Sequence, residues 1–189
     1  MKRTVKIPTS LSEITTAQLI QYLIGKPTDT EGAILRALKI FSGIDPEELR
    51  ILSLEDHQEV LEAVAGMLNE VPESPATFEF EGITYGRIPD FNEMTIGEFV
   101  DLSNYLRDER HLAKAMAVAY RPVTKKMKRL YTIEEYEGSK KYEAVMERVP
   151  ADISTGLAVF FYALAKALAV TGLLSSQEKA QMRKALHSL

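Results

Sequence analysis

The spacing of apolar residues along the chain predicts a series of short amphipathic helices. Apolar positions recur every three or four residues, as on one face of a helix, and Thr15-x-x-Gln18 has the spacing of a capping box. The early runs cover residues 15–24 and 31–41, a short piece from Asp45-Pro46, and residues 53–68. The later runs cover residues 95–106 and 109–120, short pieces at Thr132-x-x-Glu135 and 140–148, a long apolar helix after Pro150, and a last helix from Ser175-x-x-Glu178.

Alternating apolar and polar positions predict β-structure in two places. Thr4–Ile7 alternates in this way and Pro8 ends the run, as expected for a short strand. Thr77–Phe80 and Ile83–Tyr85 flank the pair Glu81-Gly82, which is typical of a β-hairpin with a two-residue turn. The expected fold class is therefore α+β, mainly α with a small β-sheet or hairpin.

The chain divides at a Pro-rich, polar stretch, residues 71–76, which is a linker candidate. Residues 1–70 form the first predicted part and residues 77–189 the second. Lys6-Ile7-Pro8 and Thr15-x-x-Gln18 in the first part match Arg87-Ile88-Pro89 and Thr95-x-x-Glu98 in the second. This match predicts one compact domain built from two related strand–helix–helix halves whose β-elements pair in one small sheet; chance agreement of cap and strand signals is the alternative.

One apolar segment raises the question of a membrane. Residues 156–174 contain a single charged side chain, Lys166, and a spanning helix needs about 20 apolar residues. A central lysine costs roughly 2.5–3.5 kcal/mol on insertion scales, and alanines keep the hydropathy of the segment moderate. We therefore expect a buried central helix and no membrane association.

No pattern in the sequence points to an enzyme. The chain has no cysteine, which excludes thiolate metal sites and cysteine catalysis. The three histidines, His57, His111 and His187, lack metal-ligand spacing, and no nucleophile-elbow, Walker or dinucleotide-binding motif is present. Adjacent acidic residues fall at predicted helix starts, where the helix dipole accounts for them. We expect no catalytic residue, no metal and no cofactor.

Charge is strongly segregated, although the net charge is only −4. Residues 45–81 contain eleven acidic residues and one basic residue, Arg50, whereas residues 110–133 contain seven basic residues and no acidic one. Basic residues interleaved with aromatics suit contact with a nucleic-acid backbone. The simpler interpretations are a solvated loop between helices, or pairing with the acidic half within the molecule or in a neighbouring copy. The candidate binding residues are Tyr120, Arg121, Lys125, Lys126, Lys128, Arg129 and Tyr131.

Three segments resemble small proteins encoded among the structural genes of tailed bacteriophages. They are residues 6–19, 117–123 and 131–139. The resemblance implies a non-enzymatic tail assembly chaperone or minor virion protein, present in the host cytoplasm, the virion or both. Its partners would be other phage proteins, such as tape-measure, tail, portal or capsid proteins, with a homo-oligomer as a further option. The alternative is a nucleic-acid-binding or regulatory protein that uses residues 121–129.

Overall fold

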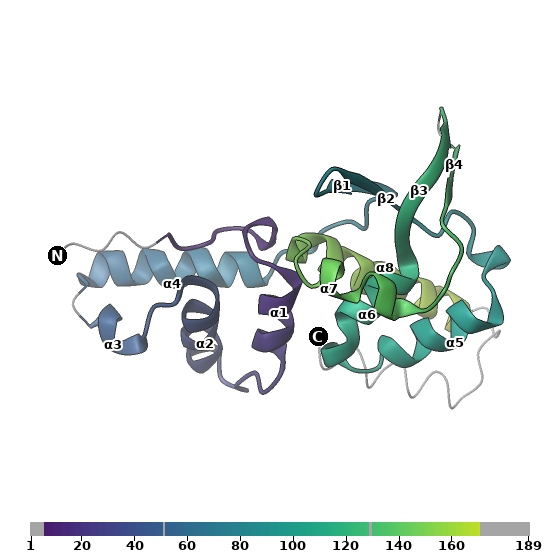
Figure 1. The fold of residues 1–189 in the computed structure, drawn as a ribbon. Coiled ribbons are helices and arrows are strands. Elements are labelled where there is room, and N and C mark those ends of the chain that lie inside the picture. The colour runs from purple at the N-terminus through teal and green to yellow at the C-terminus, as the bar shows by residue number, and fades with distance from the viewer. Residues whose placement is uncertain (1–5, 51, 129, 171–189) are drawn as a thin grey trace.

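A computed structural model describes residues 6–50, 52–128 and 130–170 of the chain. It shows an elongated molecule with two lobes side by side (Figure 1). The first lobe is entirely helical, and the second combines helices with a four-stranded antiparallel sheet. The predicted class, mainly α with a small β-sheet, is confirmed.

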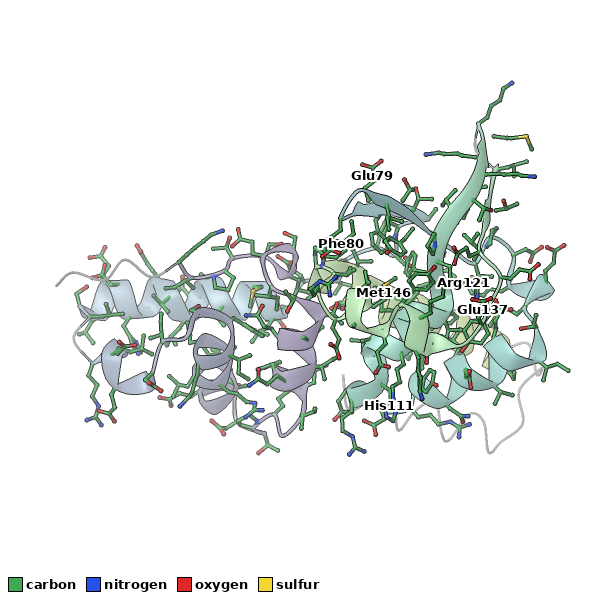
Figure 2. All side chains as sticks on the ribbon, in the orientation of Figure 1. Glu79, Phe80, His111, Arg121, Glu137 and Met146 are labelled. Atoms are coloured by element: carbon green, nitrogen blue, oxygen red, sulfur yellow. The ribbon has the colours of Figure 1, made fainter. Side chains whose placement is uncertain are left out.

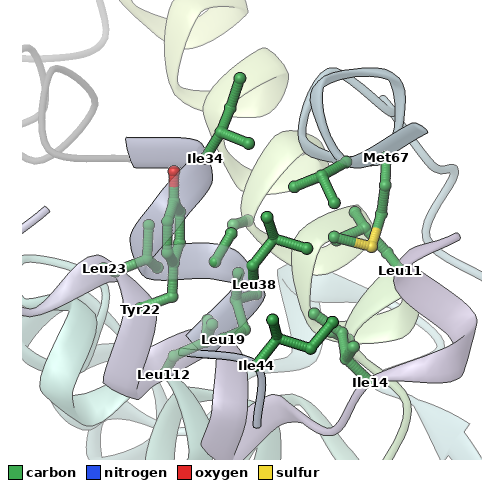
Figure 3. Close-up of a cluster of buried hydrophobic side chains, with 14 of the residues drawn as sticks. Leu11, Ile14, Leu19, Tyr22, Leu23, Ile34, Leu38, Ile44, Met67 and Leu112 are labelled. Atoms are coloured by element: carbon green, nitrogen blue, oxygen red, sulfur yellow. The ribbon is translucent and has the colours of Figure 1, made fainter. Parts of the chain in front are cut away.

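The N-terminal lobe is built from short helices whose ends follow local capping rules. The capping box is present, because the Thr15 amide donates to the Gln18 side chain (2.9 Å) and the Gln18 amide donates to the Thr15 hydroxyl (3.2 Å). The elements are the 3-10 turn η1 (Leu11–Glu13) and helices α1 (Thr16–Leu23), α2 (Thr30–Ser42), α3 (Pro46–Leu49) and α4 (Leu54–Leu68). Their apolar faces meet in one buried cluster around Leu38, Val64 and Met67 (Figure 3).

The C-terminal lobe places a sheet above a layer of helices (Figure 1). Its strands are β1 (Thr77–Phe80), β2 (Ile83–Arg87), β3 (Tyr120–Met127) and β4 (Leu130–Ile133), paired in that order. Its helices are α5 (Ile96–Tyr105), α6 (Leu112–Ala119), α7 (Glu143–Met146) and α8 (Ala151–Val170), with 3-10 turns η2 (Phe91–Glu93), η3 (Glu109–His111) and η4 (Ser139–Lys141). The predicted hairpin of residues 77–85 is confirmed as β1 and β2, and a second capping box starts α5, with Thr95 and Glu98 as its partners.

Backbone hydrogen bonds and shared core residues join the two lobes. The Thr16 amide donates to Val149 O (2.8 Å) and the Ala151 amide donates to Ile14 O (2.9 Å). Leu112 and Ala158 come from the second part of the chain but pack in the core of the first lobe. The N-terminal lobe therefore does not complete its core from its own segment alone.

Residues 71–76, the predicted linker, are held against the second lobe. The Tyr120 hydroxyl donates to Pro75 O (2.7 Å) and lies 2.8 Å from the Ser74 hydroxyl. At Gly156 of α8 the chain passes so close that an added Cβ would lie 2.6 Å from Glu73 O. The segment is irregular in backbone but is fixed by specific contacts.

The predicted pairing of two repeated β-elements is not found in the described residues. Lys6 and Ile7, the described part of the first element, form no strand, residues 4–5 lie outside the described residues, and the four strands that the structure describes come from residues 77–133. What the two halves share is local: η1 and a capping box precede α1, and η2 and a capping box precede α5.

The long apolar helix is only partly buried. In α8, Ala151 and Leu157 are completely buried, whereas Tyr162 is 42% exposed and Lys166 is exposed. Over the described residues, no helix is both long and apolar enough to cross a membrane. Residues 171–174 of the apolar segment, and the expected last helix from Ser175, lie outside the described residues.

Candidate interaction surface

Strands β3 and β4 form a two-stranded hairpin that projects from the second lobe, here called the arm (residues 123–133) (Figure 1). Met127 pairs with Leu130, which leaves a two-residue turn with Lys128 at a φ of 52°, as in the tight hairpins favoured by strand twist. β-Branched and aromatic residues such as Val123, Thr132 and Ile133 favour this extended form. The expected loop between helices, and the expected helix at Thr132-x-x-Glu135, are therefore wrong.

Pro122 marks the base of the arm. It pairs with Tyr85 of β2, and from Val123 onward β3 pairs with β4 instead. A proline lacks the N–H that a central strand needs, and here it lies where the strand changes partners. The helix that the sequence predicts over 109–120 ends one residue earlier, at Ala119, because β3 begins at Tyr120.

The tip of the arm combines apolar and basic side chains that point into solvent (Figure 2). Met127 is 71% exposed and Leu130 is 72% exposed. Lys125, Lys126 and Lys128 are exposed as well, and none of the three has an ion-pair partner among the described residues. Arg129, the remaining predicted contact, lies outside the described residues.

Sequence reasoning selected the three lysines but missed Met127 and Leu130. The available signal was two large apolar side chains embedded in a run of charged ones, Lys-Lys-Met-Lys-Arg-Leu. Met127 and Leu130 are paired across the strands, and adjoining apolar side chains that are exposed together mark a candidate interaction site. The candidate surface therefore consists of Lys125, Lys126, Met127, Lys128 and Leu130.

Two of the predicted contact residues do not belong to this surface. Tyr120 is completely buried and Arg121 is 5% exposed, because β3 leaves the buried end of α6 directly and starts inside the core. Arg121 lies within the second lobe, at the base of the arm (Figure 2). The prediction that Tyr120 and Arg121 are exposed contact residues is wrong, since neither side chain can reach a partner.

Arg121 instead forms a buried ion pair with Glu98 of α5. The guanidinium lies 2.5 Å from the Glu98 carboxylate and 5.5 Å from the centre of the Tyr136 ring, and both charged side chains are 6% exposed. Burial raises the pKa of Glu98, but hydrogen bonds from Thr95 and the ion pair with Arg121 outweigh burial and leave the pKa lowered. The pair thus fixes the base of β3 to α5 in charged form.

A second polar contact with α5 comes from Tyr136, which follows β4 and the arm. Its hydroxyl donates to the Asp101 carboxylate (2.6 Å). Burial, and then the bond to this carboxylate, raise the pKa of Tyr136, so the phenol stays protonated as the donor. Two polar contacts therefore tie α5 to the chain on either side of the arm.

Tyr131, the other predicted aromatic contact, is directed toward the protein. Its hydroxyl lies 2.7 Å from Arg87 O and 2.9 Å from Ala76 O, and its side chain is partly buried. The ring passes over Gly86 so closely that a Cβ there would lie 2.6 Å from Tyr131 Cε2. Tyr131 secures β4 to β2 and does not offer a free face for stacking.

Over residues 6–50, 52–128 and 130–170, no group of three or more His, Asp or Glu side chains is placed to hold a metal ion. His111 lies against the ring of Tyr105. A groove of about 250 Å³ between α1 and α8 has mainly apolar walls, with Lys26 and Glu70 as its charged lining residues. The contact between His111 and Tyr105 and the groove between α1 and α8 are packing features, and neither places a nucleophile beside a base.

No protein-family model, curated protein or solved structure matches the chain.

Proposed function

We propose that this chain is a non-enzymatic assembly protein that binds other proteins through the tip of the arm. The observation that carries the proposal is the exposure of Met127 and Leu130 on a projecting hairpin whose base is fixed by buried polar contacts. A rigid base reduces the entropy lost when a partner covers the tip. An apolar centre surrounded by polar groups is the usual composition of a binding hot spot.

The phage resemblance of residues 6–19, 117–123 and 131–139 supplies the class of partner. Tape-measure, tail, portal and capsid proteins are the candidates, and the site of action would be the host cytoplasm or the virion. Exposed lysines beside the apolar pair favour a partner surface with an acidic rim, because charge complementarity speeds association and selects among partners.

Replacement of both apolar tip residues, Met127→Ser with Leu130→Ser, is expected to abolish capture of the partner. Complete burial of one such side chain contributes roughly 1.5–3 kcal/mol, so loss of two weakens binding by at least about 100-fold. The measurement is a pull-down of the tagged protein from cells that express its native neighbours, with crosslinking and mass spectrometry. Val71→Ser is the matched control, because Val71 is 74% exposed and lies outside the arm.

Capture unchanged by the double substitution would exclude the tip as the contact. Recovery of one long helical phage protein that is absent from finished particles would support a chaperone, whereas recovery together with tail, portal or capsid subunits would support a virion protein.

Nucleic-acid binding is the second candidate, and the ribbon form of the arm favours it. The major groove of DNA admits a two-stranded β-ribbon, and Lys125, Lys126 and Lys128 are exposed along this one. Tyr120 and Tyr131 do not support nucleic-acid stacking, because Tyr120 is buried and the Tyr131 hydroxyl is bonded to backbone carbonyls. Protein binding is therefore the better supported proposal.

If nucleic acid is the partner, affinity for a labelled duplex is expected to fall steeply between about 50 and 200 mM salt. Substitution of Lys125, Lys126 and Lys128 by Ala would then abolish binding, while substitution of the exposed Lys140 and Lys166 by Ala would leave it unchanged. Affinity that survives the arm substitutions removes this candidate.

A further inference from the structure

Helix α4 carries a row of acidic side chains on its solvent face. Glu55, Glu59 and Glu62 are exposed and follow one another at intervals of four and three residues, so they share one side of the helix. None of them has an ion-pair partner among the described residues, although Glu62 accepts a hydrogen bond from Gln58 (2.8 Å). Like charges one turn apart repel each other.

Exposed leucines adjoin this row. Leu54, the first residue of α4, is 90% exposed and Leu52 is 38% exposed. The α4 face, defined as Leu52, Leu54, Glu55, Glu59 and Glu62, therefore has an apolar end and an acidic flank. The arm tip has the same composition with opposite charge, since Met127 and Leu130 lie among three lysines.

The two surfaces cannot meet within one molecule. Helix α4 lies in the N-terminal lobe, and the arm projects from the far part of the C-terminal lobe (Figure 1). Both lobes are joined by backbone hydrogen bonds and a shared core, which prevents the molecule from folding back on itself. The complementary charges of one chain are thus available only to another molecule.

We propose that the arm of one copy binds the α4 face of a second copy. Lys125 lies on the same face of β3 as Met127, because successive side chains alternate along a strand. Lys125, and Lys128 at the turn, oppose the glutamates of α4, and Met127 and Leu130 cover Leu52 and Leu54. This inference rests on the proposed function in using the same arm, and it names a second copy of this chain as a partner.

The arm and the α4 face are different surfaces, so two arrangements are available. Two copies related by a two-fold axis form both contacts in a closed, isologous pair, whereas copies related by a translation form one contact each in a heterologous chain. Both arrangements are held by charges near the surface. Association is therefore expected to weaken as the salt concentration rises above about 0.1 M, where the Debye length is about 10 Å.

The test is sedimentation velocity at low ionic strength on the full chain and on two charge-reversed variants. The arm variant carries Lys125→Glu, Lys126→Glu and Lys128→Glu, and the helix variant carries Glu55→Lys, Glu59→Lys and Glu62→Lys. Wild-type protein is expected to associate, and each variant alone to associate at least about 100-fold more weakly, because like charges then face each other.

An equal mixture of the two variants is expected to regain association, since each arm then meets an α4 face of opposite charge. Circular dichroism melting of each variant confirms that it is folded, and recovery in the mixture itself requires two folded partners. Monomeric wild-type protein, undiminished association of either variant, or a mixture that stays monomeric overturns the inference. The pull-down test of the tip residues does not depend on these outcomes. The proposal of self-association can therefore be wrong while the proposal of partner binding stands, and the reverse.

Discussion

Replacement of Arg121 by methionine is expected to lower the free energy of unfolding by about 3–5 kcal/mol, which is the typical cost of removing one partner from a buried ion pair. The substitution leaves the Glu98 carboxylate buried, 6% exposed, with only the Thr95 contacts to satisfy it. It also removes the bond from Arg121 to Val118 O (3.3 Å). The loss is a large fraction of the stability of a small protein and would be measured by urea unfolding.

Arg148→Met is the matched control for this prediction. Arg148 pairs with Glu81 at 2.8 Å, but those side chains are 52% and 50% exposed. Exposed ion pairs contribute about 0–1 kcal/mol, so the control is expected to change stability by less than about 1 kcal/mol. Equal losses in the two variants would contradict the assignment of Arg121 to the core.

The effect of Arg121→Met is also expected to depend on pH. The pKa of Glu98 is lowered in the folded protein, so its contribution to stability is complete above the unfolded value, about 4.3, and is lost as the pH falls through the folded value. The difference between wild-type protein and the variant should therefore be large near pH 7 and should narrow as the pH falls below the unfolded pKa of Glu98. A difference independent of pH would show that the lost packing, and not the charge pair, dominates.

Gly86→Ala is expected to lower the unfolding free energy by about 1–3 kcal/mol, the usual cost of forcing an extra carbon into a packed site. The new Cβ would lie 2.6 Å from Tyr131 Cε2 and 2.9 Å from Ile133 Cγ2. Relief of this clash moves the Tyr131 ring, and its hydroxyl then loses Arg87 O and Ala76 O. The arm should become less firmly held, and hydrogen–deuterium exchange of residues 120–133 should accelerate.

Gly66→Ala is the control, and we expect it to raise the free energy of unfolding instead of lowering it. Gly66 lies in α4 with nothing within 4 Å of the added carbon, and alanine is favoured over glycine in a helix by about 1 kcal/mol. We expect this substitution to stabilise the protein and to leave exchange in the arm unchanged. Acceleration in the arm for both glycine variants would contradict a specific role for the Gly86–Tyr131 contact.

The starts of α1 and α5 and the first hairpin could be predicted from the sequence, because short-range contacts specify them. The capping boxes at Thr15 and Thr95 join residues three apart, and the turn Glu81-Gly82, with φ values of 50° and 77°, closes β1 on β2. The exposure of Lys125, Lys126 and Lys128 was likewise predictable, since such side chains are almost never buried without a partner. These features need no information from distant parts of the chain.

Which residues of the basic segment, 120–131, face solvent depends on tertiary contacts and could not be predicted from the sequence. Arg121 and Lys125 have the same charge, but only Arg121 meets a buried carboxylate, on a helix 23 positions earlier in the chain. Tyr120 and Tyr131 are both tyrosines beside basic residues, and each binds carbonyls of residues 75–87 instead of facing outward. Burial depends on which distant segments pack over a residue, and composition and local periodicity do not encode that arrangement.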